Sequence, residues 1–320
     1  MTHVLVLMPV YNGERFLPEQ IESILTQSHT ALTLICRDDG STDKSSSILA
    51  QYAARYPDRV QVINDAVGNL GASGSFSYLM QWALAHMQTY GSAVYVALAD
   101  QDDIWHLDKL HQSLLAMHTA EKSASGVSPV LVHSDLRVVD ANANEISPSL
   151  MQYQGLDPAR TRFSAQLISN TVTGCTSLMN RALLEKALPV PAQAVMHDWW
   201  LSLVASAFGQ LVFVPRALVE YRQHGRNTLG ARRHQQAAIN WRTLSRLFQF
   251  KKSPAAQALF QQAAAQAAVF EQRFFNELDA MDRQVLRDVQ RMPRLGLWRQ
   301  RWLFRKLRVS SHCARAAGRL

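Results

Sequence analysis

Short apolar runs alternate with segments of helical spacing over residues 3–99, and this alternation limits the possible folds more than any other feature. Four runs have the composition of buried strands: 3–10, 31–37, 60–64 and 92–99. Helical patterns lie between them, one opened by Pro18 and two that cover 43–55 and 75–87. This strand–helix rhythm predicts an α/β fold, with a mostly parallel sheet and helices on both faces.

A polar cluster follows each of the four apolar runs. In chain order the clusters are "PVYNG", "RDDGSTD", "NDAVGNLGASG" and "DQDD". Because open parallel sheets bind ligands outside the carboxyl ends of their strands, we expect these clusters to meet in one crevice. The glycines of "NLGASG" would let the backbone approach a ligand closely.

The densest cluster, "DQDD", contains Asp100, Asp102 and Asp103. Like charges this close together repel one another. The cluster could be a solvated turn before the next helix. It could also hold Mg²⁺ or Mn²⁺, since these ions prefer carboxylate oxygens together with the phosphates of a ligand. We expect the second arrangement, with a metal-bound diphosphate on the cluster.

Two other clusters hold candidate contacts to a nucleotide. Asp38 and Asp39 either only form a turn or accept hydrogen bonds from a base or a ribose. Tyr11 either packs in the core or provides a platform for a nucleobase.

The second half of the chain contains a candidate general base in the segment "HDWW". Asp198 could be a plain helix N-cap, with Trp199 and Trp200 in the core. Alternatively, a carboxylate beside two indoles is partly desolvated, which raises its pKa toward the working range of a general base.

The segment "EYRQHGRNT" contains a histidine between two arginines. His224 could be an ordinary polar loop residue. If the loop folds back over the crevice, His224 can complete the coordination of a metal, and Arg222 and Arg226 can hold phosphates.

Taken together and in this order, the motifs resemble the inverting glycosyltransferases of family 2, which have the GT-A fold. The resemblance runs from residue 3 to about residue 228 and includes the segments "RDDGSTDKS", "NLGASGSFSYL", "ALADQDDIWHLDKL", "TGCTSLMNRALL" and "HDWW". The forms "DQDDIW", "HDWW" and "YRQHGRNT" are similar to the bacterial rhamnosyltransferase-like branch of that family.

The resemblance implies a nucleotide-sugar site on the first two strand ends. Pro9, Tyr11 and Asp39 would contact the base. Asp38 and Gly71 would lie near the base and the ribose.

The resemblance also implies the residues that carry out the reaction. Asp100 and Asp102 form the DxD motif, with Asp100 toward the ribose or the sugar and Asp102 on the metal. Asp198 matches the catalytic base, and His224 matches a later contact to the metal or the diphosphate. Ser75 departs from the branch, where asparagine is frequent, and this leaves the donor sugar less defined than the reaction.

The implied function is a metal-dependent inverting sugar transfer with Mn²⁺ or Mg²⁺ as cofactor. L-rhamnose would pass from dTDP-L-rhamnose to a hydroxyl of a glycan or lipid-linked acceptor in bacterial surface polysaccharide synthesis, including O-antigen. Two alternatives remain open: the same reaction with UDP-galactose, UDP-glucose or UDP-N-acetylglucosamine, and a non-catalytic module that binds nucleotide-sugars.

We expect a GT-A domain over 1–228 and a helical C-terminal region over 229–320. Residues 291–320 contain nine lysines or arginines and no acid, interleaved with leucines and aromatics. This tail either docks on the catalytic domain or lies on an anionic membrane surface as a basic amphipathic helix. The net charge of +8 also suits nucleic acid, but no recognition module accompanies it, so we expect no nucleic-acid partner.

Compartment signals agree with this function. The three cysteines are too sparse for a disulfide framework, which favours a reducing compartment. The N-terminus does not have the pattern of a signal peptide, and no segment has the length of a membrane-spanning helix. We therefore expect a cytoplasmic protein, held peripherally at the cytoplasmic face of the inner membrane.

Overall fold

The computed structural model describes residues 2–124, 126–224 and 254–296, together with 298–300, 302, 303 and 307. The strands are β1 (His3–Val10), β2 (Leu32–Asp38), β3 (Val60–Ile63), β4 (Val94–Leu98), β5 (Ile104–Trp105), β6 (Val130–Val139), β7 (Glu145–Ser147), β8 (Leu178–Met179) and β9 (Gln210–Arg222). The α-helices are α1 (Leu17–Leu25), α2 (Ser45–Arg55), α3 (Gly71–His86), α4 (Lys109–Ser123), α5 (Leu150–Gln154), α6 (Phe163–Gln166), α7 (Arg181–Ala187), α8 (His197–Phe208), α10 (Pro254–Phe274) and α11 (Ala280–Arg291). Short 3₁₀ turns cover Met87–Tyr90, Gly174–Thr176 and Met292–Arg294.

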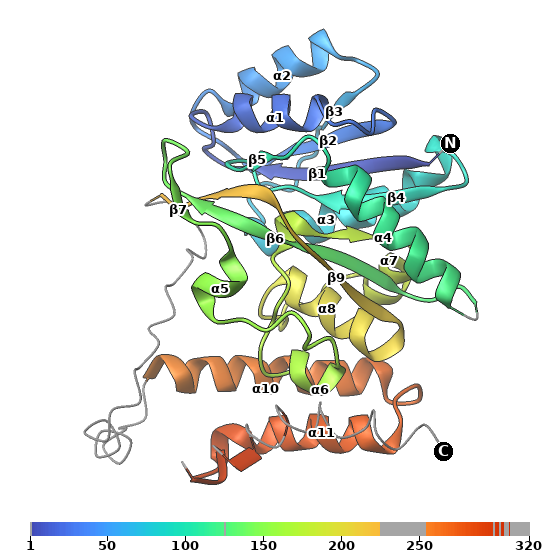
Figure 1. Cartoon of the computed structure of the whole chain (residues 1–320), viewed down its shortest axis with the longest axis vertical. Coiled ribbons are helices and arrows are strands. Elements are labelled where there is room, and N and C mark those ends of the chain that lie inside the picture. Colours follow the sequence, from blue (N-terminus) through green and yellow to red (C-terminus); the bar gives the residue numbers. More distant parts are fainter. Residues whose placement is uncertain are drawn as a thin grey trace.

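One twisted sheet runs through the molecule in the order β3-β2-β1-β4-β8-β6-β9-β5, with β7 paired to β6 (Figure 1). The first four strands in this order are parallel to one another, as the sequence predicted. β8 is antiparallel to both β4 and β6, and β9 is parallel to β6. The sheet is therefore mixed, with its longest parallel portion at the N-terminal end.

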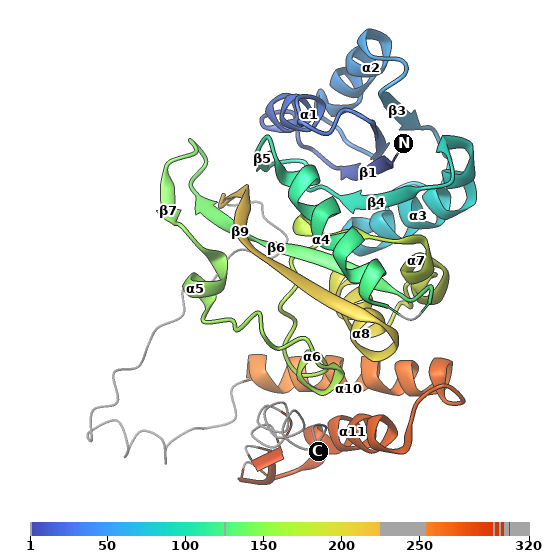
Figure 2. The ribbon, with the colours of Figure 1, turned by 45° about the vertical axis from the view of Figure 1, so that its right-hand side comes forward.

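The position of β1 inside the sheet, with helices on both faces, explains why its sequence is almost entirely apolar. Val4, Val6 and Met8 face one hydrophobic cluster, which α1 and α4 cover. Leu5 and Leu7 face a second cluster on the opposite side, which includes residues of α3, α7 and α8. A strand buried on both faces has no polar side to alternate with its apolar one. Figure 2 shows these helices on the two sides of the sheet.

Two elements differ from the sequence predictions. The sequence pattern of "LVFVP" and "ALVEYRQHG", on either side of Arg216, predicts two paired short strands, but residues Gln210–Arg222 form one long strand, β9, that follows β6. Register shifts near Ser134 and Asp135 let β9 bend without a turn. In addition, α3 begins at Gly71 rather than at Ser75, because the Asp39 carboxylate accepts hydrogen bonds from the Leu70 and Gly71 N–H groups at 2.7 and 2.9 Å.

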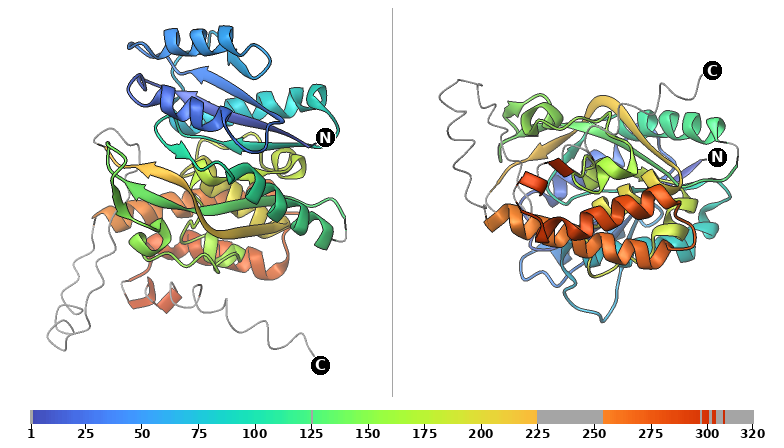
Figure 3. Two further views of the ribbon diagram at one scale, coloured as in Figure 1. Left: turned by 45° about the horizontal axis from the view of Figure 1, so that its top comes forward. Right: turned by 90° about the horizontal axis from the view of Figure 1, so that it is seen from below.

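The C-terminal helices share the core of the sheet domain. Phe270 of α10 is fully buried, and its ring centroid lies 5.3 Å from that of Trp200 in α8 and 5.0 Å from that of Phe163 in α6. α11 packs along α10, on the side away from the sheet (Figure 3). Residues 229–253 of the helical region expected over 229–320 lie outside the described residues. Within the described residues, no helix is both long enough and apolar enough to cross a bilayer.

The basic tail is described only in part. Leu303 and Leu307 are buried in the same hydrophobic cluster as α10 and α11. Trp298 and Trp302 are 70% and 64% exposed. The described part of the tail thus packs one face on the protein and presents tryptophans to solvent.

Candidate functional site

A cavity of about 970 Å³ opens at the carboxyl ends of β1, β2 and β4. From β1 the chain continues to β2 and β3 on one side and then returns to β4 on the other. The crevice where the strand order reverses is the usual ligand site of such sheets. Seven of the predicted residues line this cavity: Pro9, Tyr11, Asp39, Gly71, Asp100, Asp102 and Asp198. Asp38 and His224 are not among its lining residues.

Asp39 belongs to a buried network that holds the rim of the cavity. The Arg37 guanidinium, 1% exposed, contacts Asp39 and donates to Asp65 at 2.7 and 3.1 Å. It also donates to the Ser75 hydroxyl at 2.9 Å. Burial alone would lower the pKa of Arg37, but its bonds to Asp65 and Asp39 raise that pKa overall. The network ties the end of β2 to the start of α3. Gly71, at the start of α3, has a φ of +67°, a backbone conformation that glycine adopts more readily than other residues.

Asp38 points to a different environment from Asp39. Its carboxylate accepts a hydrogen bond from the Ser41 N–H at 3.0 Å and contacts the Ser46 hydroxyl. Asp38 therefore shapes the turn before α2, and its predicted place near the ribose stays a prediction.

Asp102 and His224 come together from distant parts of the chain. Nε2 of His224 lies 2.7 Å from Oδ2 of Asp102, and the His224 ring centroid lies 5.0 Å from that of Phe16, with the ring planes tilted by 33°. A carboxylate oxygen and an imidazole nitrogen at one point form a donor set that suits Mn²⁺. The two predicted metal contacts are therefore adjacent, at hydrogen-bond distance from each other, and both are groups that divalent cations take as ligands. Two arginines were predicted to hold phosphates. Arg226 lies outside the described residues, whereas Arg222 is buried, contacts Glu19 and does not line the cavity.

Gln101, between the two acids of the DxD motif, fixes the motif to β1. Its side-chain oxygen accepts from the Tyr11 N–H at 2.8 Å, and its side-chain nitrogen donates to the Tyr11 carbonyl at 3.0 Å. The Tyr11 ring is half exposed at the cavity. Sequence reasoning did not single out Gln101, since a glutamine in an acidic turn gives no local sign of a partner 90 residues away.

Asp100 of the DxD motif and Asp103, next to the motif, lie in a low-dielectric environment. Burial, followed by the charges of Asp102 and Asp198, raises the pKa of Asp100 to about 7. Burial also raises the pKa of Asp103 and of the Cys175 thiol. Ligand atoms of Asp100, Asp103 and Cys175 lie within 4.8 Å of one another, but a thiol kept neutral is a poor metal ligand. Asp102, whose neighbour His224 offers a ring nitrogen rather than a thiol, is therefore the better cation site.

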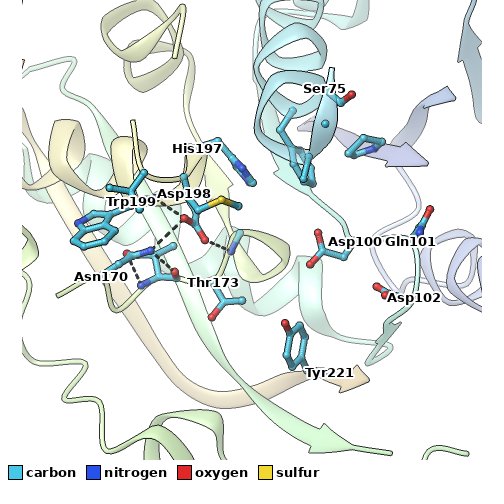
Figure 4. A pocket seen from close by; sticks show the side chains of 18 of the residues that line it. Ser75, Asp100, Gln101, Asp102, Asn170, Thr173, His197, Asp198, Trp199 and Tyr221 are labelled. Carbon is cyan, nitrogen blue, oxygen red and sulfur yellow. Dashed lines mark hydrogen bonds between the residues drawn. The ribbon is translucent and has the colours of Figure 1, made fainter. Parts of the chain in front are cut away.

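Asp198 lies in the first turn of α8, facing the DxD motif across the cavity (Figure 4). Its carboxylate accepts hydrogen bonds from the Trp199 N–H at 2.6 Å, the Gly174 N–H at 3.1 Å and the Asn170 amide at 3.2 Å. Burial raises its pKa to about 6, although these donors favour the ionised form. A carboxylate with this pKa and a place on a cavity wall has the properties of a general base near neutral pH.

Asn170 and Gly174 also escaped sequence reasoning, although both bind Asp198. Asn170 lies in a segment without regular structure, where no periodic pattern marks it. Trp199 and Trp200 are buried, as expected, and the Trp199 indole donates to the Gln166 carbonyl at 2.6 Å.

Comparison with known proteins identifies the family. The sequence profile described as Glycosyl transferase family 2 matches residues 5–188, more than half of the chain. The chain belongs to glycosyl transferase family 2. The match ends before Asp198, so the position of that residue in the cavity is information that the family profile does not supply.

Curated relatives of this family 2 chain include three bacterial proteins. An uncharacterised glycosyltransferase of a Nostoc strain is 27% identical over 226 residues, 69% of this chain and 65% of that protein. The dTDP-rhamnosyl transferase RfbG of Shigella flexneri is 25% identical over 70% of this chain and 74% of its own. The teichuronic acid biosynthesis glycosyltransferase TuaG of Bacillus subtilis, named as putative, is 26% identical over 74% of this chain and 85% of its own. This chain thus spans about two thirds or more of the length of these relatives.

Solved structures confirm the GT-A fold. The S. aureus protein TarS, residues 1–349 with UDP-GlcNAc, superposes with a TM-score of 0.56 at 13% identity, over 98% of this chain and 88% of that chain. GalNAc-T7 with UDP, GalNAc and Mn²⁺ superposes with a TM-score of 0.53 at 13% identity, over 86% of this chain and 54% of that chain. The predicted fold class is therefore confirmed. The predicted enzyme class, a glycosyltransferase, is confirmed by the family match and by the curated relatives.

Proposed function

We propose that this family 2 protein transfers a sugar from a nucleotide-sugar to an acceptor hydroxyl with inversion, in the synthesis of a bacterial surface polysaccharide. The observation that supports this most strongly is that Asp102 and Asp198, 96 positions apart (198 − 102), line one cavity at the switch point of the sheet. A non-catalytic binding module would need no carboxylate with a raised pKa on the wall opposite the DxD motif.

In the proposed reaction, Asp198 removes the proton from an acceptor hydroxyl. Its Oδ2 accepts only the Gly174 N–H among the described residues, and a carboxylate oxygen can accept about two hydrogen bonds, so there is room for that hydroxyl. The acceptor oxygen forms a bond to the anomeric carbon while the bond from that carbon to the diphosphate oxygen breaks. The nucleoside diphosphate leaves, and one displacement inverts the configuration.

We propose that Asp102 and His224 hold a divalent cation, Mn²⁺ or Mg²⁺, beside the diphosphate. Such an ion would neutralise the charge that develops on the leaving group. Tyr11, Asp39 and Gly71 surround the space where the nucleoside would bind. Asp100, beside Asp102 on the same cavity wall, would contact the ribose or the sugar.

The donor that we favour is dTDP-L-rhamnose. The relationship to RfbG, a dTDP-rhamnosyl transferase, supports this choice. Ser75 adds no support for this donor, because asparagine is frequent at this position in the rhamnosyltransferase-like branch. The Ser75 hydroxyl, at the cavity wall, already accepts a hydrogen bond from Arg37. UDP-hexoses are the alternative, supported by the structural likeness to TarS with UDP-GlcNAc.

A donor panel tests the proposal. Nucleotide-sugar hydrolysis and thermal shift would be measured for dTDP-L-rhamnose, UDP-galactose, UDP-glucose and UDP-GlcNAc, each with and without Mn²⁺. We expect a metal-dependent shift and slow hydrolysis with one donor. Binding without hydrolysis of any donor, even with glycan acceptors present, would favour the non-catalytic module instead.

We further propose that the enzyme works at an anionic membrane surface on the cytoplasmic face of the inner membrane, on a glycan or lipid-linked acceptor. The exposed Trp298 and Trp302, with the exposed Arg291, Arg294 and Arg299, support this placement.

A further inference from the structure

The cavity has two ends of different chemistry. The end under β1, β2 and β4 is polar, lined by Asp39, Asn69, Asp100, Gln101 and Asp102. The other end, beyond Asp198, carries a group of apolar side chains, namely Leu150, Leu156, Val172, Val195, Met196 and Leu259, with the polar Gln154, Asn170, Thr171, Thr173 and Gln262 between them. The elements that carry them, α5 and α10 among them, lie on the far side of the molecule from β1–β3 (Figure 1).

Helix α10 belongs to this apolar end, although it lies outside the segment that the family profile matches. Leu259 and Gln262, one turn apart on α10, both line the cavity. Leu259 is 42% exposed, so its side chain is available for contact.

The position of α10 relative to the candidate base is fixed by two contacts. Gln266 of α10 accepts a hydrogen bond from the Val195 N–H at 2.9 Å, just before the helix that carries Asp198. Phe270, one turn further along, packs on Trp200 of that same helix. Leu259 and Gln262 are therefore held near Asp198 by a helix that is anchored in the core.

We propose that the apolar end of the cavity is the acceptor subsite, that Leu259 is a specificity-determining residue in it, and that the acceptor carries an apolar aglycone next to its sugar. This inference rests on the proposed function. In-line displacement requires the acceptor to approach opposite the leaving diphosphate, and its hydroxyl must reach Asp198. The polar end is taken by the nucleotide, so the wall built by α5 and α10 is what the rest of the acceptor meets.

The mixed lining suits an acceptor with a polar part and an apolar part. Sugar hydroxyls can bond to the side chains of Gln154 and Gln262, but Leu156, Val172 and Leu259 offer no hydrogen bonds to a sugar. An alkyl or prenyl group linked to that sugar would instead remove this apolar surface from water. A lipid-linked acceptor meets both requirements, since its sugar reaches Asp198 while its hydrocarbon lies along Leu259.

The test compares octyl and methyl glycosides of the same sugars (L-rhamnose, galactose and N-acetylglucosamine) as acceptors, below the critical micelle concentration of the octyl compounds. The full-length protein is used with the donor found active in hydrolysis. We expect a lower KM for an octyl glycoside than for its methyl counterpart. L259Q should reduce the octyl preference in kcat/KM roughly tenfold, since it removes one apolar contact.

Two further variants and one donor measurement keep the result interpretable. Leu259→Met should retain the octyl preference. Leu115→Gln changes a leucine of α4 that is 52% exposed and does not line the cavity, and it should have no effect. The donor KM and the rate of donor hydrolysis should be the same in all variants.

Several outcomes would overturn the inference. An octyl preference that survives in L259Q, or an equal loss with both glycosides, removes Leu259 from the role proposed. Wild-type protein that hydrolyses donor but shows no octyl preference overturns the apolar acceptor and leaves the proposed function standing. Wild-type protein that turns over no donor at all would refute the proposed function itself, and the inference with it.

Discussion

Nε2 of His224 lies 2.7 Å from Oδ2 of Asp102, although 122 positions separate the two residues along the chain. His224 follows the end of β9, and Asp102 belongs to the turn after β4. Their contact joins both halves of the sheet at the rim of the cavity, where we propose that a divalent cation binds.

Asp102→Asn should abolish the Mn²⁺-dependent part of nucleoside diphosphate binding, because an amide is a much weaker metal ligand than a carboxylate. His224→Ala should weaken that binding without abolishing it, since Asp102 remains. Calorimetric titration with dTDP and with UDP, in the presence and absence of Mn²⁺, would measure both effects. Asp108→Asn is the control, since Asp108 pairs with Arg216 and does not line the cavity. Unchanged metal dependence in Asp102→Asn would exclude this residue as a ligand.

Asp198→Asn should lower kcat by about 10²–10⁴-fold, the usual contribution of general-base assistance. Donor affinity should stay close to that of the wild type, since the polar end of the cavity is untouched. Initial rates and donor titrations on the same preparation would separate the two quantities. Asp58→Asn, at an exposed position between α2 and β3, should behave as wild type. Near-normal turnover in Asp198→Asn would rule out its role as the base.

The pH dependence follows from the raised pKa of Asp198. A base acts only when it is deprotonated, and burial raises the pKa of this carboxyl to about 6. We therefore expect kcat/KM to fall about tenfold for each pH unit below 6 and to level off above it. Rates between pH 4.5 and 8, checked for stability at each pH, would show the inflection. The pH profile of the residual activity of Asp198→Asn should lack this inflection. A flat wild-type profile would contradict the role of Asp198 as the general base.

Arg37→Met should destabilise the protein, because it leaves Asp39 and Asp65 without the cation between them. Removing one partner of a buried pair costs about 3–5 kcal/mol. Urea unfolding followed by tryptophan fluorescence would measure the loss. Arg55→Met, at an exposed position in α2, is the matched control and should change the free energy of unfolding by less than about 0.5 kcal/mol. Equal stability of the two variants would show that the network contributes little.

Trp298→Ser combined with Trp302→Ser should weaken binding to vesicles that contain anionic lipid. Both indoles are mostly exposed, so their removal should leave the fold intact. Co-sedimentation with phosphatidylglycerol vesicles, compared with pure phosphatidylcholine, would measure the effect at low and high salt. Phe275→Ser, on a residue that is 52% exposed after α10, controls for a general loss of apolar surface. Equal binding of the wild type to both kinds of vesicle would argue against an electrostatic membrane surface.

The parallel half of the sheet could be predicted because its signals are local. β1 is apolar without interruption because it is buried on both faces, and the acidic turns follow strands whose carboxyl ends must share one edge. The irregular half was harder to predict. β9 was divided in two at Pro215, since the bend that lets it follow β6 depends on a register shift in the partner strand.

The sequence by itself determined the fold class and the acidic residues of the site, since strand periodicity and turn composition are written in neighbouring positions. Only the tertiary structure decided which groups meet: Gln101 with the Tyr11 backbone, Asn170 with Asp198, and Leu259 with the far end of the cavity. Such contacts depend on how helices and loops pack over the sheet edge. A raised pKa such as that of Asp198 likewise comes from burial among residues distant in the chain, which no local pattern encodes.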